Sequence, residues 1–563
     1  MGSSQSVEQA APAEQQVPVT LPEQHLVQEQ QATGSVRSSL SSVNSIQFPQ
    51  RQRRSSARAP AHMSWGHGSQ SLATQNFQDD DELPPSSVAM ASASAEPDPD
   101  VCQDGPLTLS TRVEYSAMPK DAVQRVFGLV TVQAGAAAGA AAATSERKPM
   151  DIVCVLDVSG SMGSQNKIED LKAAVRFIVG EALPKDRLSL VTFNSGAERQ
   201  LRLRRMDREG QDEATVATLR MRAGGGTRIA HGLDLGLQVL EQRRQRNKVS
   251  AILLLTDGQD GSCRSQLPQL LQRAGKLGCG IYAFGFGRDH DSELLREIGE
   301  QARTPFTYVE ETALVREAFA GVVGGLSSVV AQQVQLSLRC QVQLKEVNTP
   351  FQVQREGESV ATVTIPDIFA EERRDILVEL SVPSGAGPAS GSFALLEASA
   401  RYVAVGEQEV LMQTPAVTMT VDRVDEPQPE QEPDAEVADQ RERWEVTRVL
   451  EEASKQSDEG HFEAAQQLLR NKRQALPKNR PVTEALSLEL EDAEQRMANT
   501  MTWSTGAHEV KDATVMHQMQ RCTNMFDNKS GIAKKSKGLY ARTTQREWIS
   551  KTAPSGAASS SAP

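Results

Sequence analysis

The sequence has few aromatic residues and few cysteines for its 563 residues. Aromatic residues make up only 4%, and Ser, Gln, Pro and Ala are frequent near both ends, so we expect the terminal regions to be largely disordered. The six cysteines are scattered without a C-x-x-C pair, which argues against a secreted disulfide scaffold and fits a reducing cytosol. No signal peptide and no apolar run long enough to span a bilayer is recognisable. The expected location is therefore the cytoplasm.

The chain also lacks an excess of basic residues, since its net charge is −13. Proteins that bind nucleic acid through the phosphate backbone need a cationic surface, so we expect no nucleic-acid partner. The length exceeds that of one ordinary hydrophobic core, which predicts two or three domains.

The most informative stretch is DIVCVLDVSGSMG at residues 151–163. Its apolar run, Ile152 to Leu156, is typical of a strand buried on both faces of a parallel sheet. The small-residue loop that follows carries Asp157, Ser159 and Ser161, which place three hard oxygen atoms on one short turn. Oxygen ligands of this type suit Mg²⁺, Mn²⁺ or Ca²⁺ rather than zinc. By itself, this loop could also be a polar turn between a strand and a helix.

Two later stretches strengthen the metal-site interpretation. In AGGGTRIAHGLDL, three glycines place Thr227 at the start of a predicted helix. In KVSAILLLTDG, a second apolar strand, Val249 to Leu255, leads into Asp257. In an open α/β sheet, ligands bind outside the carboxyl ends of the strands, where these loops are expected to meet.

The three loops, in this order, resemble the metal-ion-dependent adhesion site of von Willebrand factor type A (vWA) domains. The resemblance implies a Mg²⁺ ion, or Mn²⁺ or Ca²⁺, with Ser159 and Ser161 as direct ligands. It also implies that Thr227 and one of the two aspartates exchange direct for water-mediated contacts. An open coordination position would accept a Glu or Asp of a protein partner. The implied ligand set is Asp157, Ser159, Ser161, Thr227 and Asp257.

An alternative of a different class is an enzyme, such as a metal-dependent hydrolase. A haloacid dehalogenase-type phosphatase needs a second aspartate two residues after the first, but Ser159 occupies that position. A general base is missing from the loops, so we expect no catalysis. A further alternative is a scaffold or adaptor in ubiquitin-related processes with an unused metal site. The domain order resembles intracellular vWA proteins, some of which carry RING-type ligase domains, but the sequence contains no RING cysteine pattern.

The predicted fold class is a doubly wound, mostly parallel α/β sheet, inserted in or followed by an antiparallel β-sandwich, with a small C-terminal helical module. Period-two patterns on both sides of the α/β region favour the inserted arrangement. The predicted segments are a disordered region at 1–105, strands that complete the sandwich at 106–133, the vWA domain at 148–328, the β-sandwich at 330–423, an acidic linker at 424–437, the helical module at 438–500 and a mostly irregular tail at 501–563.

The N-terminus begins MGSSQS, which fits the pattern for myristoylation of Gly2. One myristoyl chain binds membranes only marginally, so a second signal is needed for stable attachment. A basic cluster could supply it by attraction to the anionic inner leaflet, or it could be an ordinary solvated patch. The cluster consists of Arg51, Arg53, Arg54 and Arg58.

Overall fold

In the computed structural model, all described residues belong to one compact unit, Thr74–Pro563. The predicted lipid-attachment residue Gly2 and the basic cluster Arg51, Arg53, Arg54 and Arg58 lie outside the described residues. The structure describes residues 79–83, 105–120, 123–135, 147–286, 291–302, 304, 306–309, 314–388, 391–405, 409–424, 431–478, 480–521 and 542–552.

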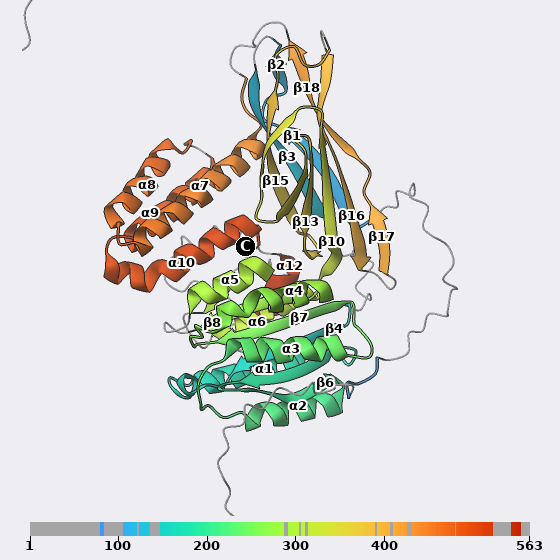
Figure 1. Ribbon diagram of the computed structural model, residues 1–563, viewed down its shortest axis with the longest axis vertical. Coiled ribbons are helices and arrows are strands. Elements are labelled where there is room, and N and C mark those ends of the chain that lie inside the picture. The colour runs from blue at the N-terminus through green and yellow to red at the C-terminus, as the bar shows by residue number, and fades with distance from the viewer. Residues whose placement is uncertain are drawn as a thin grey trace, which may run out of the picture. The chain divides into compact units, whose positions relative to one another are not determined.

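A six-stranded sheet forms the α/β domain (Figure 1). The strand order is β6-β5-β4-β7-β8-β9, and only β6 runs antiparallel to its neighbour. Each residue of β4 and β7 is buried, as expected for the central strands of a sheet covered on both faces. The strands are β4 (Met150–Asp157), β5 (Arg187–Phe193), β6 (Ala197–Arg205), β7 (Val249–Thr256), β8 (Gly280–Phe286) and β9 (Thr307–Val309).

Helices cover both faces of this sheet. Alternate residues of β4 point to opposite sides, so Ile152 and Cys154 pack with α1, α2 and α6, whereas Val153 and Val155 pack with α3, α4 and α5. The predicted doubly wound fold is therefore confirmed, and the carboxyl ends of the parallel strands meet at one edge. The helices are α1 (Lys167–Glu181), α2 (Arg208–Arg220), α3 (Ile229–Gln242), α4 (Leu267–Leu277), α5 (Ser292–Ala302) and α6 (Val315–Leu326), with short 3₁₀ turns η2 (Gly160–Gly163) and η3 (Cys263–Ser265).

The α/β domain is inserted into a β-sandwich. Strands before it, β1 (Leu107–Val113) and β3 (Gln124–Ala134), join β15 (Arg373–Val382) and β11 (Gln343–Asn348) after it in one sheet of order β1-β3-β15-β11. The second sheet packs against the first around a shared apolar core. It contains β2 (Ala117–Pro119), β10 (Val329–Cys340), β12 (Gln352–Glu356), β13 (Val360–Ile365), β14 (Ile368–Phe369), β16 (Gly391–Val405), β17 (Glu409–Gln413) and β18 (Val417–Val424).

Helices follow the sandwich, and the expectation of a mostly irregular tail after residue 500 is wrong for α10 (Thr500–Met519) and α12 (Thr543–Ser550). The apolar residues of α10 are divided between two cores, because Trp503 packs with the helical module and Met519 with the sandwich. Its sequence therefore shows no single apolar stripe. The other C-terminal helices are α7 (Ala435–Asp458), α8 (Phe462–Ala475) and α9 (Pro481–Arg496).

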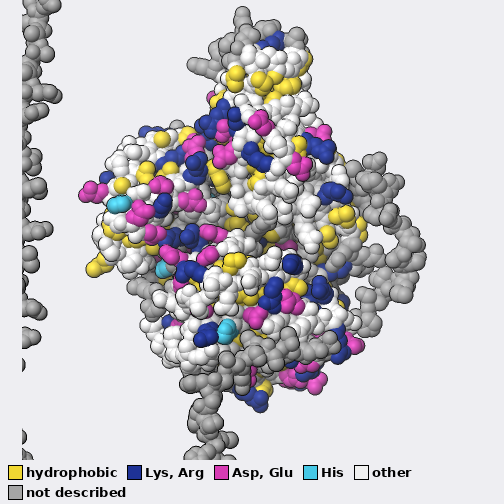
Figure 2. Space-filling model, viewed as in Figure 1, with side chains coloured by type: hydrophobic (Ala, Val, Ile, Leu, Met, Phe, Trp, Pro, Cys, Tyr) yellow, Lys and Arg dark blue, Asp and Glu magenta, His cyan; other side chains and the backbone are white. Residues whose placement is uncertain are grey.

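Surface charge and the character of the helices relate to two expectations, that the protein has no nucleic-acid partner and no membrane span. On the face shown in Figure 2, acidic and basic side chains of the described residues are interspersed rather than gathered into a broad patch of one sign. Among the described residues, no helix combines the length and the apolar character needed to cross a membrane.

Candidate metal centre

The first predicted loop leaves the sheet at the carboxyl end of β4. Asp157 is its last residue, and the carboxylate is buried. One oxygen, Oδ1, accepts a hydrogen bond from the Ser159 backbone N–H at 2.7 Å, and Oδ2 accepts one from the Thr256 hydroxyl at 2.5 Å. Both donors are neutral, so no cation of the chain contacts Asp157 in these hydrogen bonds.

The third loop approaches the first through its aspartate. The Ser161 hydroxyl donates to Oδ1 of Asp257 at 2.7 Å, and the hydroxyl oxygens of Ser159 and Ser161 lie 3.0 Å apart. Ser159 is buried whereas Ser161 is exposed, so this group of oxygen atoms extends from the interior to the surface. Four of the five predicted ligands, Asp157, Ser159, Ser161 and Asp257, are thus joined in one series of hydrogen bonds.

The second loop is fastened to the first by backbone hydrogen bonds. The Gly160 N–H donates to the Gly225 carbonyl at 3.0 Å, and the Gly224 N–H donates to the Val158 carbonyl at 2.8 Å. Gly225 has a φ of +86°, a conformation that glycine adopts without strain. This geometry brings the second loop to the edge occupied by the first.

Thr227 completes the set by lying against the third loop. A Cβ atom added at Gly258 would be 2.8 Å from the Thr227 hydroxyl oxygen, which is too close for any side chain except hydrogen. The glycine after Asp257 is therefore needed for the approach of Thr227. The structure brings together all five residues that the sequence predicted: Asp157, Ser159, Ser161, Thr227 and Asp257.

Burial leaves Asp157 poorly compensated. Burial is the largest influence and raises the pKa of Asp157 to about 6, and the negative charge of Asp257 acts in the same direction. Hydrogen bonds from Ser159 and Thr256 lower the pKa but offset only part of this effect. A cation placed among these oxygen atoms would stabilise the charged form of Asp157.

Lys167 is a charged neighbour that the sequence interpretation missed. Its ammonium group donates to Oδ2 of Asp257 at 2.6 Å, and both side chains are almost fully buried. Asn166, with a φ of 62°, turns the chain just before α1 so that the first residue of the helix faces the strand ends. The sequence signal was the lysine's position ten residues after Asp157, but a lysine at the start of a helix is usually solvated.

The donor set fits a hard divalent cation. Two carboxylates and three hydroxyls match the oxygen ligands preferred by Mg²⁺, Mn²⁺ and Ca²⁺. The described part of the chain has no group of three or more His, Cys, Asp or Glu side chains that could hold a metal, so a zinc-type centre has no support there. Asp157, Ser159, Ser161, Thr227 and Asp257 are the residues that would hold the ion.

The surface beside the first loop is hollowed. A pocket of about 320 Å³ is lined by Val158 at the end of β4, Asn194 after β5, and Arg220 and Arg222 at the end of α2. Arg220 and Arg222 are exposed. The exposed Glu198 also lines the pocket, so the two arginines leave it with one net positive charge, which an acidic segment approaching the candidate metal centre would find next to it.

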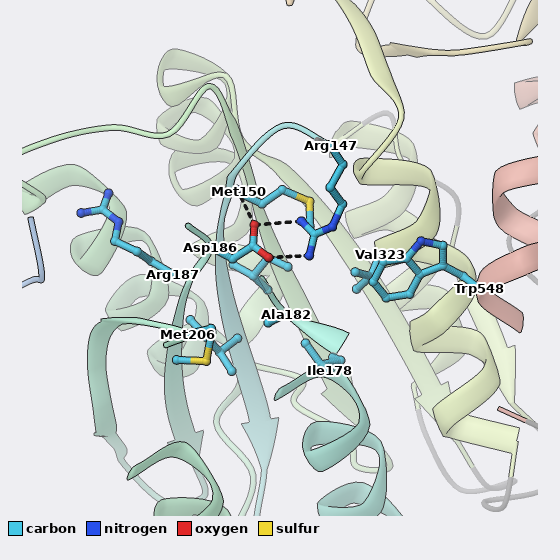
Figure 3. A pocket seen from close by; sticks show the side chains of 11 residues that line it. Arg147, Met150, Ile178, Ala182, Asp186, Arg187, Met206, Val323 and Trp548 are labelled. Carbon is cyan, nitrogen blue, oxygen red and sulfur yellow. Dashed lines mark hydrogen bonds and ion pairs between the residues drawn. The ribbon is translucent and has the colours of Figure 1, made fainter. Parts of the chain in front are cut away.

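A smaller hollow at the opposite end of the sheet has a different character (Figure 3). It lies between Met150, Ile178 of α1, Val323 of α6 and Trp548 of α12, and its volume is about 10 Å³. One water molecule needs roughly 10–15 Å³ on this measure. This cavity is a packing gap rather than a second ligand site.

Comparison with known proteins agrees with the geometry. Residues 151–320 match the von Willebrand factor type A domain. In sequence, the chain is 31% identical over 260 residues to the E3 ubiquitin-protein ligase WAV3 of Arabidopsis thaliana, covering 43% of this chain and 32% of that protein. It is 30% identical over 187 residues to the calcium-activated chloride channel regulator 3A-1 of Mus musculus, covering 33% of this chain and 20% of the regulator. The chain thus spans about a third or less of the length of these relatives.

A solved structure supports the fold. The von Willebrand factor type A protein from Catenulispora acidiphila superposes with a TM-score of 0.56 at 16% identity, covering 71% of this chain and 90% of that one. At this identity the likeness shows a shared fold. The chain is therefore a vWA-domain protein, distantly related to the plant WAV3 ligases and to the calcium-activated chloride channel regulators.

Proposed function

We propose that this protein is a non-catalytic adaptor that binds an acidic residue of a protein partner through a divalent cation at the vWA metal centre. The observation that carries the proposal is the convergence of Asp157, Ser159, Ser161 and Asp257 at an exposed edge of the sheet. Protein interaction through such a centre is typical of vWA domains.

The charges of the centre favour an acidic ligand. Asp157 and Asp257 carry two negative charges, and Lys167, which forms an ion pair with Asp257, contributes one positive charge. A divalent ion would leave the loaded centre with one net positive charge. When bound, the ion would offer a Lewis-acidic coordination position, and the nearby Arg220 and Arg222 would add attraction for a carboxylate.

The loop residues support binding rather than catalysis. Ser159 stands where a phosphatase of the haloacid dehalogenase type would need its second aspartate. The side chains in contact at the centre are hydroxyls, carboxylates and the Lys167 ammonium, which holds Asp257. These contacts include no histidine, and the Asp257 carboxylate that accepts from Ser161 is also engaged by Lys167, so we propose binding rather than catalysis.

The decisive experiment is capture of cell-extract proteins on the immobilised chain in Mg²⁺ and in EDTA. We expect proteins that are retained in Mg²⁺, released by EDTA and lost with Asp157→Ala. The matched control is Asp212→Asn, which removes an exposed carboxylate from α2 and should leave capture unchanged. A captured protein should lose binding when its contacting Glu or Asp is replaced by Gln or Asn. Equal capture in all lanes would contradict the proposal.

A second candidate is a scaffold in ubiquitin-related processes with an unused metal site. The similarity to the E3 ubiquitin-protein ligase WAV3 favours it. The same experiment separates the two functions, because this scaffold would retain ubiquitin-ligase components equally in Mg²⁺ and EDTA and with Asp157→Ala.

Attachment to the inner leaflet through Gly2 remains a prediction that accompanies either function. Incorporation of labelled myristate into the full chain, compared with Gly2→Ala, tests it directly. A failure to incorporate the label would place the adaptor in the cytoplasm without this anchor.

A further inference from the structure

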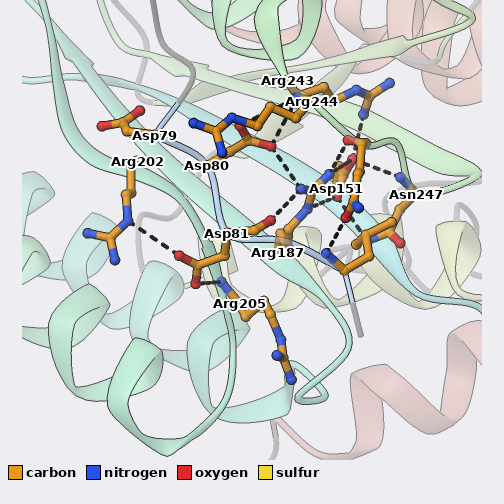
Figure 4. Close-up of polar contacts among 12 residues, drawn as sticks. Asp79, Asp80, Asp81, Asp151, Arg187, Arg202, Arg205, Arg243, Arg244 and Asn247 are labelled. Atoms are coloured by element: carbon orange, nitrogen blue, oxygen red, sulfur yellow. Dashed lines mark hydrogen bonds and ion pairs between the residues drawn. The ribbon is translucent and has the colours of Figure 1, made fainter. Parts of the chain in front are cut away.

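A short acidic segment, Asp79–Leu83, lies along the edge of the α/β sheet (Figure 4). The edge strand is β6, whose outer backbone groups have no neighbouring strand among the residues that the structure describes. The Asp81 N–H donates to the Leu203 carbonyl at 3.0 Å, and the Arg205 N–H donates to the Asp81 carboxylate at 2.9 Å. The segment thus uses edge-strand groups that commonly bind added peptides.

The centre of the segment balances a buried charge. The Arg187 guanidinium is fully buried and donates to both oxygens of Asp151 at 2.8 Å. Arg243 donates to the same carboxylate at 2.6 Å, so two buried guanidinium groups share one carboxylate of the domain. Asp80, which accepts from Arg187 at 3.1 Å, brings the cluster to neutrality. Without a carboxylate at that position, the cluster would hold one uncompensated positive charge.

The two flanking aspartates are also held by arginines. Arg199 donates to both carboxylate oxygens of Asp79 at 2.7 Å, a two-pronged geometry that recognises carboxylates by shape as well as charge. Arg204 donates to Asp81, and Arg202 lies 3.4 Å from the same carboxylate. Each of the three consecutive aspartates is therefore bound by a different arginine.

The segment is fixed at its end through the backbone. The Leu83 N–H donates to the Gln245 side chain at 2.5 Å, and Arg187 donates to the Asp81 carbonyl at 2.8 Å. These contacts recognise an extended acidic peptide, not isolated charges. We call the surface made by Arg187, Arg199, Arg202, Arg204 and the outer edge of β6 the arginine groove.

The Arg187 end of the arginine groove is separate from the candidate metal centre. Arg187 begins β5 and pairs in register with Asp151 near the start of β4, whereas Asp157 ends β4. At about 3.3 Å per residue, the two ends of β4 lie roughly 20 Å apart. Arg199 lies nearer the metal end, because it pairs with Val191, which in turn pairs with Val155 of β4. The contacts to the aspartates are made by arginine side chains, so the groove needs no metal ion to attract an acidic ligand.

The segment belongs to the same chain as the arginine groove, so it competes with any free peptide for the same arginines. Residues 84–104 join it to β1, and a chain of this length can span at most roughly 75 Å. A ligand in the same chain competes with free ligands at an effective concentration that depends on the length and stiffness of the connection. An acidic peptide of a partner that brings carboxylates to the same arginines could take the place of the segment, because the segment is not one of the paired strands of the sheet.

We propose that the arginine groove is a docking site for linear acidic peptides of the Asp-Asp-Asp-Glu-Leu type, which Asp79–Leu83 occupies in cis and an acidic segment of a partner occupies in trans. This inference goes beyond the proposed function and does not depend on it. The chain's own segment competes with the partner peptide, so a partner must bind tightly enough to displace it.

The test is fluorescence anisotropy with a labelled peptide of residues 77–84 (FQDDDELP) and the full chain. We expect at least tenfold tighter binding to the chain with Asp79, Asp80 and Asp81 all replaced by Asn than to wild type, because the tethered competitor is weakened. Addition of Arg204→Gln should reduce this binding at least tenfold, whereas the matched control Arg208→Gln, an exposed arginine of α2, should not. A peptide with Asn in place of Asp should not bind.

Two further measurements keep the test decisive. Thermal melting establishes whether the triple variant folds, and if it does not, Asp79→Asn with Asp81→Asn is used, which keeps the buried Asp80. EDTA should leave peptide binding unchanged, which separates the groove from the metal centre and from the proposed metal-dependent function. Failure of the peptide to bind a folded variant, or binding that ignores Arg204→Gln, would overturn the proposal.

Discussion

The two ends of β4 carry the same residue type in contrasting surroundings. Asp151 and Asp157 are both fully buried aspartates of one strand. Asp151 accepts hydrogen bonds from Arg187, Arg243 and Asn247, so the chain supplies its counter-charge. Asp157 accepts only from neutral donors in its hydrogen bonds, and its pKa is raised to about 6 by burial. A buried carboxylate that is paired with protein cations supports the fold, whereas one that lacks them is available for an external cation.

The sharpest way to break this comparison is to remove each carboxylate in turn. Asp151→Ala should lower the free energy of unfolding by about 3–5 kcal/mol, because two buried guanidinium groups lose a partner. Asp157→Ala should cost much less in EDTA, since it removes a charge that the fold leaves poorly compensated. Urea unfolding of both variants in EDTA measures the difference. Equal losses of unfolding free energy would show that the two carboxylates contribute to the fold in the same way.

Metal addition should affect only one end. In Mg²⁺ at about 100 times its Kd, wild type should gain roughly 2.7 kcal/mol of stability relative to EDTA. Asp157→Asn should gain little, because one of the predicted ligands is lost, while Asp212→Asn should behave like wild type. Thermal melting with and without Mg²⁺ reports the gain. Equal stabilisation of Asp157→Asn would place metal binding elsewhere.

Lys167 offers a way to alter the charge of the metal end without removing a ligand. Lys167→Met frees Oδ2 of Asp257 and makes the centre more negative, so the apparent Mg²⁺ affinity should rise by about tenfold. Calorimetric titration with Mg²⁺ measures the change. Lys172→Met is the control, because Lys172 on the same helix pairs with Glu169 instead. An unchanged affinity in Lys167→Met would argue against an electrostatic role of the lysine.

The arginine groove should respond to acid. The Arg199 hydrogen bond lowers the pKa of Asp79, and the bonds from Arg204 and Arg205 lower the pKa of Asp81 despite its burial. Because these folded-state pKa values lie below the ordinary Asp value of about 3.9, docking adds stability that is present above that pH and is lost as the pH falls through the lowered values. Anisotropy of the labelled peptide between pH 3 and 7 should show loss only at the acidic end. Weakening already at pH 6 would implicate other groups.

Much of the metal centre could be predicted because its ligands follow strand ends and helix starts that are visible in the sequence. Parallel strands bring their carboxyl ends to one edge, so loops far apart in sequence were expected to meet. The charged residues around these ligands were harder to predict from the sequence. Lys167 resembles an ordinary surface lysine, and the pairing of Arg187 with Asp80 joins residues 107 positions apart.

The fold was predictable to a similar extent. The predicted apolar runs Ile152 to Leu156 and Val249 to Leu255 lie within the buried strands β4 and β7. The helix α10 was missed because its apolar residues serve two cores, and a pattern directed to two sides has no clear period. α12 is short and is stabilised by packing of Trp548 on Gly324 of α6, a tertiary contact that local propensity does not reveal.

The insertion of the α/β domain sets an order for synthesis of the chain. Strand β3 pairs with β15 in a register that joins Gln133 to Arg373, so 240 positions separate the partners. At about 5–20 residues per second, translation separates their appearance by roughly 12–48 s. During that interval β3 can pair with β1, but its other edge is without its final neighbour. The whole α/β domain is therefore synthesised while the apolar strand β3 still has one open edge.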